Sequence, residues 1–197
     1  MTAPHSQLSH PLRSQRLNQL THQPHSRLDA LVKSQDPFAS RERFARFVAA
    51  QCLFQYDLEK LYADAVLGKL IPDLAQRCRL EQTRLDLADL GHPVPQGDES
   101  IRAQAHGVGA ALGWLFVSEG SKLGAAFLLK RMPALGLSET FGARHLGEPE
   151  GGRAQGWKRF VAVVDDIALD AEQERLAEAA AIAAFERFVA HLERCFA

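Results

Sequence analysis

Two glycines interrupt the strongest helical pattern in this chain. They are Gly120 and Gly124, and they lie four residues apart in the segment from Ser118 to Lys130. An interior glycine costs a helix about 1 kcal/mol relative to alanine, so the pair needs a compensating contact. Because four residues nearly complete one helical turn, both glycines bare the backbone on the same face. Either a second helix packs closely on that face or a flat, bulky ligand lies against it.

The composition is that of an ordinary globular domain. The 197 residues are 46% hydrophobic, which is enough for one sizeable core. Basic and acidic residues number 23 and 24, so no broad electrostatic field favours nucleic acid or an anionic membrane. Three scattered cysteines without C-x-x-C spacing argue against a disulfide framework and a zinc site. No apolar run approaches the roughly 18 residues of a membrane helix and no signal-peptide pattern is present, so we expect a cytoplasmic protein.

Helical periodicity dominates the chain and strand alternation is nearly absent, which predicts an all-α fold. Residues 1–9 are expected to form a disordered tail and residues 10–197 a single domain. The glycine segment is expected to bend its helix. A short capped helix is predicted at 138–141, and a loop at 147–152. The longer predicted helices run from Leu12 to Asp36, from Ser40 to Leu61, from Pro72 to Leu90, from near Asp98 into the glycine segment, through 157–164, and from a capping box at Asp170 and Gln173 to Phe196.

Motifs of the common cofactor enzymes are absent. The sequence has no G-x-G-x-x-G after a strand, no Walker motif and no H-E-x-x-H. We therefore expect no bound flavin or nicotinamide, and electrons for any redox reaction must come from outside the chain.

A pair of histidines offers the one candidate for metal ligation. His22 and His25 lie three residues apart, and Asp29 follows His25 at the spacing that lets two side chains on a helix meet. A carboxylate in that position can orient an imidazole and raise the basicity of its other nitrogen toward a metal. An exposed His–Asp pair on a helix surface satisfies the same spacing, so both interpretations stay open at this point.

Taken together, these segments resemble a known family. Residues 12–29 and 118–130 are similar to the proximal and distal helices of heme oxygenases of the bacterial, biliverdin-producing type. Further similarity lies at 55–62, 86–91 and 141–146, in the family's order. The resemblance implies an all-α, single-domain helical bundle in which heme is sandwiched between a proximal helix and a kinked, glycine-rich distal helix.

The resemblance also implies roles for individual residues. His25 matches the axial iron ligand and Asp29 its acidic partner; His22 is the competitor, but the residue four positions after it is Ser26. Gly120 and Gly124 match the positions where the distal backbone lies close over the heme. Side chains that resemble heme-binding, propionate-holding or water-anchoring groups are Asn18, Lys33, Arg79, Asp86, Phe116, Ser121, Lys130 and Arg131.

The activity implied is cleavage of heme by O2 to biliverdin, with release of iron and carbon monoxide. Heme b is both substrate and cofactor, and a ferredoxin- or flavodoxin-type reductase system supplies electrons to a monomeric enzyme. The purpose is either iron acquisition or biliverdin supply. Two alternatives remain: a heme-binding carrier or sensor that does not degrade its ligand, and a helical interaction protein with no ligand.

Overall fold

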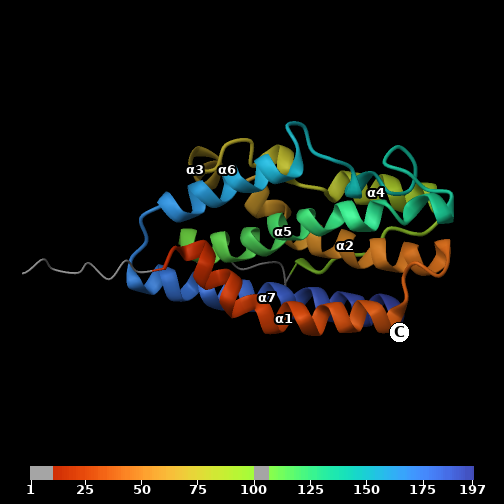
Figure 1. Cartoon of the computed structure of the whole chain (residues 1–197), viewed down its shortest axis with the longest axis horizontal. Coiled ribbons are helices and arrows are strands. Elements are labelled where there is room, and N and C mark those ends of the chain that lie inside the picture. The colour runs from red at the N-terminus through yellow and green to blue at the C-terminus, as the bar shows by residue number, and fades with distance from the viewer. Residues whose placement is uncertain (1–10, 100–106) are drawn as a thin grey trace, which may run out of the picture.

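The computed structural model describes residues 11–99 and 107–197, and within these residues the chain is helical, with only isolated bridges from Ser138 to Phe141 and Gly142. The predicted tail at 1–9 lies outside the described part. Four long helices run along the long axis of the molecule (Figure 1). They are α1 (Arg13–Gln35), α2 (Arg41–Tyr62), α5 (Gly107–Leu129) and α7 (Ala171–Phe196), and α7 packs against the other three. The all-α prediction is confirmed.

The ends of the long helices follow local chemistry. At the start of α2, the Ser40 side chain accepts a hydrogen bond from the Arg43 N–H at 3.2 Å, as expected of an N-cap. At the end of α1, Asp36 adopts a left-handed conformation with φ of 38° and Pro37 follows, so the helix cannot continue. Inside α1, Pro24 removes the N–H that would bond to the carbonyl of Leu20, one residue before His25.

The predicted helix from Pro72 to Leu90 is wrong. The chain instead forms α3 (Ala65–Leu70), a 3-10 turn η1 (Ala75–Arg77) and α4 (Leu80–Asp89). Asp64 caps α3, Asp73 takes a left-handed φ of 58°, and Cys78 is extended, so the backbone leaves the helical conformation twice. Leu74, Leu80 and Leu87 are still buried, which is why the apolar pattern resembled one helix.

The predicted short helix at 138–141 is also wrong. Ser138 and Phe141 pair their backbone N–H and C=O groups at 2.9 and 3.1 Å, and the Ser138 hydroxyl accepts a hydrogen bond from the Thr140 N–H. This local bonding competes with helix formation. The short helical turns lie on either side, as η3 (Met132–Leu135) and η4 (Arg144–Leu146). The loop at 147–152 is confirmed, with positive φ at Gly151 and Gly152.

The predicted starts of two helices have different outcomes. The start near Asp98 adjoins residues 100–106, which lie outside the described part, and α5 is described from Gly107 onward. The last helix does begin after Asp170, whose side chain accepts from the Gln173 N–H at 2.8 Å. The Gln173 side chain does not complete a capping box; its Oε1 accepts a hydrogen bond from the N–H of Gly109 on α5 instead. The predicted helix around 157–164 is α6 (Arg153–Asp166).

Helices α5 and α7 approach so closely that side chains are excluded between them. A Cβ on Gly109 would lie 2.1 Å from the Gln173 carbonyl oxygen, and one on Gly113 would lie 2.2 Å from that of Ala177. Both distances are far below any van der Waals contact. The small residues that permit close helix packing in α5 are therefore Gly109 and Gly113, a pair that the sequence analysis did not single out.

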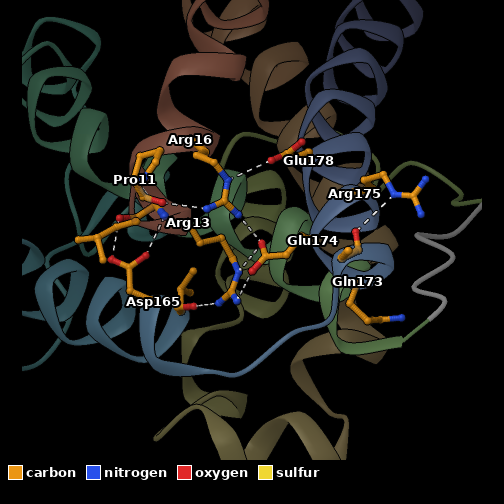
Figure 2. A network of polar contacts seen from close by, with 12 residues as sticks. Pro11, Arg13, Arg16, Asp165, Gln173, Glu174, Arg175 and Glu178 are labelled. Atoms are coloured by element: carbon orange, nitrogen blue, oxygen red, sulfur yellow. Dashed lines mark hydrogen bonds and ion pairs between the residues drawn. The ribbon is translucent and has the colours of Figure 1, made fainter. Parts of the chain in front are cut away.

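The start of α1 is held in place by a polar network with α6 and α7 (Figure 2). The buried Arg13 guanidinium binds both carboxylate oxygens of Glu174, at 3.0 and 2.7 Å, and also the carbonyl oxygen of Ile167. Ser14 donates through its N–H and its hydroxyl to Asp165, at 2.8 and 2.7 Å. Such bidentate, charge-assisted bonds have well-defined geometry. The network therefore fixes where α1 crosses the bundle.

We predict opposite effects from alanine at two glycines of α5. Gly113→Ala should destabilise the protein by about 2 kcal/mol, because the added methyl group forces α5 away from α7. Gly124→Ala should be neutral or stabilise it by up to about 1 kcal/mol, because alanine is the better helix former and its Cβ would meet nothing within 4 Å. Urea unfolding followed by circular dichroism measures both, and equal losses of stability would contradict the packing difference.

Candidate active site

The proximal side of the candidate site is the middle of α1. The His25 side chain is 61% exposed, and its Nδ1 lies 3.3 Å from Oδ2 of Asp29. Its ring also meets Phe185 of α7 edge-on, with ring centroids 5.8 Å apart. These two contacts orient the imidazole. No hydrogen bond between described residues uses its Nε2, so that nitrogen suits a ligand.

His22 has a different environment from His25. It is exposed, and its backbone carbonyl accepts a hydrogen bond from the Ser26 hydroxyl at 3.0 Å. No carboxylate or aromatic ring within the described residues orients its imidazole. The predicted pairing of His25 with Asp29 is thus present in the structure, whereas His22 has no comparable support.

The distal side of the candidate site is the second half of α5. A Cβ on Gly124 would meet nothing within 4 Å, and one on Gly120 would reach only the Trp157 ring, at 3.5 Å. Neither glycine is required by helix packing, in contrast to Gly109 and Gly113. On the same half of the helix, Leu123 is 37% and Phe127 72% exposed. An apolar surface beside bare backbone is what a flat, apolar ligand would cover.

Aromatic side chains back this part of α5. Phe116 is buried, with its ring centroid 5.2 Å from that of Trp157, which in turn stacks on Phe160 at 5.9 Å. Phe116 is therefore part of the core, and Trp157 is the aromatic residue that faces Gly120. Sequence reasoning missed Trp157 as a site residue, because nothing local connects it to a glycine 37 positions earlier. Ser121 is exposed, and its hydroxyl donates to the carbonyl of Ser118.

The predicted propionate-binding cations gather at one end of the bundle, where α1 and α5 both finish (Figure 1). Lys33 is exposed in the last turn of α1. Lys130 lies over the Phe127 ring at 5.8 Å, and the Arg131 guanidinium lies 4.2 Å from the centroid of Phe38. Asn18 is exposed near the other end of α1. Lys33 and Asn18 therefore lie on α1, whereas Lys130 and Arg131 directly follow the end of α5.

The two predicted water anchors have contrasting surroundings. Asp86 of α4 is fully buried, and its carboxylate accepts the N–H groups of Arg144 and His145 and contacts the His145 ring at 2.7 Å. These bonds hold η4 against α4 and use both carboxylate oxygens. The Arg79 guanidinium is half-buried, and its Nε is buried without a hydrogen-bond partner in the described chain. Burial lowers the pKa of Arg79, although the charge of Glu119 opposes the shift.

A cavity of about 730 Å³ lies elsewhere, between α3, the start of α5 and the α6–α7 connection. Its lining includes Lys69, Asp166 and Gln173, and none of the predicted site residues. In the described chain, no helix is both long and apolar enough to cross a membrane.

We predict that Asp86 contributes stability that is lost in acid. Burial raises the pKa of its carboxyl. The hydrogen bonds and charge of His145 and the bound N–H groups together lower the pKa by more, so the net shift is downward from 3.8. A carboxyl whose pKa is lower in the folded state than in the unfolded state stabilises the fold at any pH above its unfolded-state pKa. This stabilisation disappears as the pH falls through its folded-state pKa. Asp86→Asn should therefore cost about 3 kcal/mol near neutrality. Its deficit relative to the parent should shrink only below about pH 4, which urea titrations at several pH values would measure.

Known proteins of similar sequence and structure belong to a single family. The family model described as heme oxygenase matches residues 12–194. The chain is 65% identical over 186 residues to the heme oxygenase PigA of Pseudomonas aeruginosa, covering 94% of both chains. It is 36% identical over 125 residues to a heme oxygenase of Xanthomonas campestris, covering 61% of this chain and 68% of that one.

Among solved structures, the NO- and CO-bound heme oxygenase of Neisseria meningitidis superposes with a TM-score of 0.89 at 35% identity, covering 95% of this chain and 93% of that chain. A family model that spans nearly the whole sequence, and a relative this similar along its whole length, leave one assignment. The chain belongs to the heme oxygenase family.

Proposed function

We propose that this chain cleaves heme to biliverdin in the presence of O2, with release of iron and carbon monoxide, and that heme b binds between α1 and α5. The observation that carries the proposal is the contrast within α5. Gly109 and Gly113 are required by packing on α7, whereas Gly124 borders open space and Gly120 only the Trp157 ring, beside the exposed apolar side chains of Leu123 and Phe127. Bound heme would supply the iron at which O2 is activated and the macrocycle that is oxidised.

His25 is the proposed axial ligand on the proximal side. Its Nδ1 faces Asp29, so the neutral ring can present Nε2 to the iron while the carboxylate raises the ligand's basicity. An imidazole would donate less electron density to the iron than a thiolate, and this weaker donation would suit oxidation of the macrocycle rather than of a foreign substrate.

Gly120 and Gly124 would form the distal ceiling. Without Cβ atoms, the backbone of α5 can approach the macrocycle closely, which leaves room for O2 but limits its orientation. Leu123 and Phe127 would cover apolar parts of the ligand that are otherwise in water. The distal backbone thus directs the reaction toward the ring edge.

Polar groups would fix the ligand's rotation and bring protons. Lys33, Lys130 and Arg131, with Asn18, are the proposed partners of the propionates, and the choice among them determines which meso edge faces the oxygen site. Ordered water would carry protons to the distal side. Arg79 has an unpaired Nε to anchor such water, whereas the oxygens of Asp86 are already bonded to Arg144 and His145.

The remaining inferences concern context. We propose a cytoplasmic, monomeric enzyme that receives electrons from a ferredoxin- or flavodoxin-type donor. The cations Lys33, Lys130 and Arg131 suit an acidic donor that docks beside the heme edge. Both iron acquisition from heme and supply of biliverdin require the same chemistry.

The product of the reaction tests the proposed function. Purified protein mixed with hemin should give a stoichiometric complex with a sharp Soret band. Addition of ascorbate or of a reductase system in air should remove that band and yield biliverdin, identified by chromatography against the isomers. A carrier or sensor would keep its Soret band through repeated reduction, and an interaction protein would form no such complex.

We predict that the two histidines of α1 can be distinguished by matched substitutions. His25→Ala should remove the axial ligand, so that the ferric spectrum changes and turnover falls by at least about 100-fold. His22→Ala, on the same helix and also at an exposed position, should leave both unchanged. Absorption and resonance Raman spectra of the two complexes provide the measurement. The opposite pattern would transfer the ligand role to His22.

A further inference from the structure

The residue immediately before Gly120 is a buried carboxylate. Glu119 is 5% exposed, and its Oε1 accepts a hydrogen bond from the Tyr62 hydroxyl at 2.8 Å. Its Oε2 pairs with the Arg77 guanidinium at 3.0 Å, and Lys122 also donates to Oε1. Both cations are themselves largely buried, with side chains 14% and 15% exposed. The charge of Glu119 is thus fully compensated and held away from water.

The hydrogen bonds around Glu119 have a defined direction. An ionised carboxylate only accepts, so Tyr62 must donate to it. Tyr62 has one proton to donate, so the hydroxyl of Ser118, 2.8 Å away, must donate to the Tyr62 oxygen. The Gln55 amide donates to Ser118 at 3.1 Å and accepts the Arg79 N–H at 2.8 Å. Every hydrogen bond in this series therefore points toward Glu119, and the series fixes the position of the carboxylate charge.

The cations stand close enough to influence one another. Burial lowers the pKa of Lys122, Glu119 raises it, and the charges of Arg79 and Arg77 lower it again. Charges in such a partly dehydrated cluster are screened far less than surface charges. Any group bound against the neighbouring turn of α5 therefore experiences their field.

We propose that the Glu119 cluster, defined as Glu119, Lys122, Arg77 and Tyr62, sets the electrostatic field on the distal face of the bound heme. The proposal rests on the proposed function in one respect, namely that heme lies against the Gly120 and Gly124 face of α5. Glu119 precedes Gly120 in the same helical turn, so its carboxylate is attached to the turn of α5 that would form the distal ceiling. A rigid, buried charge at that position tunes the heme without touching it.

Carbon monoxide on the reduced heme complex is a direct probe of this field. A more positive distal environment strengthens donation from iron into the carbon monoxide and lowers the C–O stretching frequency. The test compares four variants of the heme-bound protein by infrared spectroscopy. Glu119→Gln and Lys122→Met change the charge in opposite senses, Glu119→Asp keeps it, and Tyr62→Phe removes a hydrogen bond without changing charge.

The expected shifts have opposite signs. Glu119→Gln should lower the C–O frequency and raise the midpoint potential of the heme, whereas Lys122→Met should do the reverse. Glu119→Asp should give values closer to those of the parent than Glu119→Gln does, and Tyr62→Phe should shift them least. Shifts of the same sign in both charge variants, or no shift in either, would overturn the proposal and leave only a structural role.

Failure of this inference can be distinguished from failure of the proposed function. The infrared measurement needs heme bound at its iron and no turnover, so a chain that bound heme without degrading it would still answer the question. If biliverdin forms but neither charge variant moves the C–O band, the function stands and this inference fails. Thermal unfolding identifies any variant that does not fold. Should Glu119→Gln be one of them, the sign of the Lys122→Met shift decides alone.

Discussion

The close contact between α5 and α7 is the constraint on which the rest of the molecule depends. Carbonyl oxygens of α7 occupy the space that Cβ atoms at Gly109 and Gly113 would need, so the first half of α5 has one possible position against the bundle. Gln173 adds a hydrogen bond from its side chain to the Gly109 N–H. With the first half of the helix fixed in this way, Gly120 and Gly124 in the second half are not needed for close helix packing, although Ala125 on the same half is buried in the core.

A second constraint brings the opposite wall to the site. Arg13 and Ser14 tie the start of α1 to α6 and α7 through buried, charge-assisted bonds (Figure 2), and Phe185 of α7 meets the His25 ring further along. Helix α7 therefore serves as the common support of the proximal and distal helices. The relation between His25 and Gly124 is determined by how each packs on α7, and only slightly by direct contact between α1 and α5.

Local patterns predicted most helices but failed where a side chain or a special backbone angle redirected the chain. The caps at Ser40 and Asp170 and the stop at Asp36 were predictable, since each depends on residues within one turn. The break at Cys78 was not, because Leu74 and Leu80 on either side of it are buried as if one helix carried them. The predicted helix at 138–141 was wrong for a similar reason, because a serine side chain can cap a helix or a tight turn equally well.

The sequence by itself determined the all-α class, the shared face of His25 and Asp29, and the unusual bareness of α5 at Gly120 and Gly124. Each of these follows from spacing within one or two turns, and helical geometry converts spacing into position. Only the tertiary structure decided which glycines pack and which stay open, and that a carboxylate at Glu119 is surrounded by buried partners. Such contacts join residues far apart in the chain, and their distances depend on how whole helices cross, which no local pattern encodes.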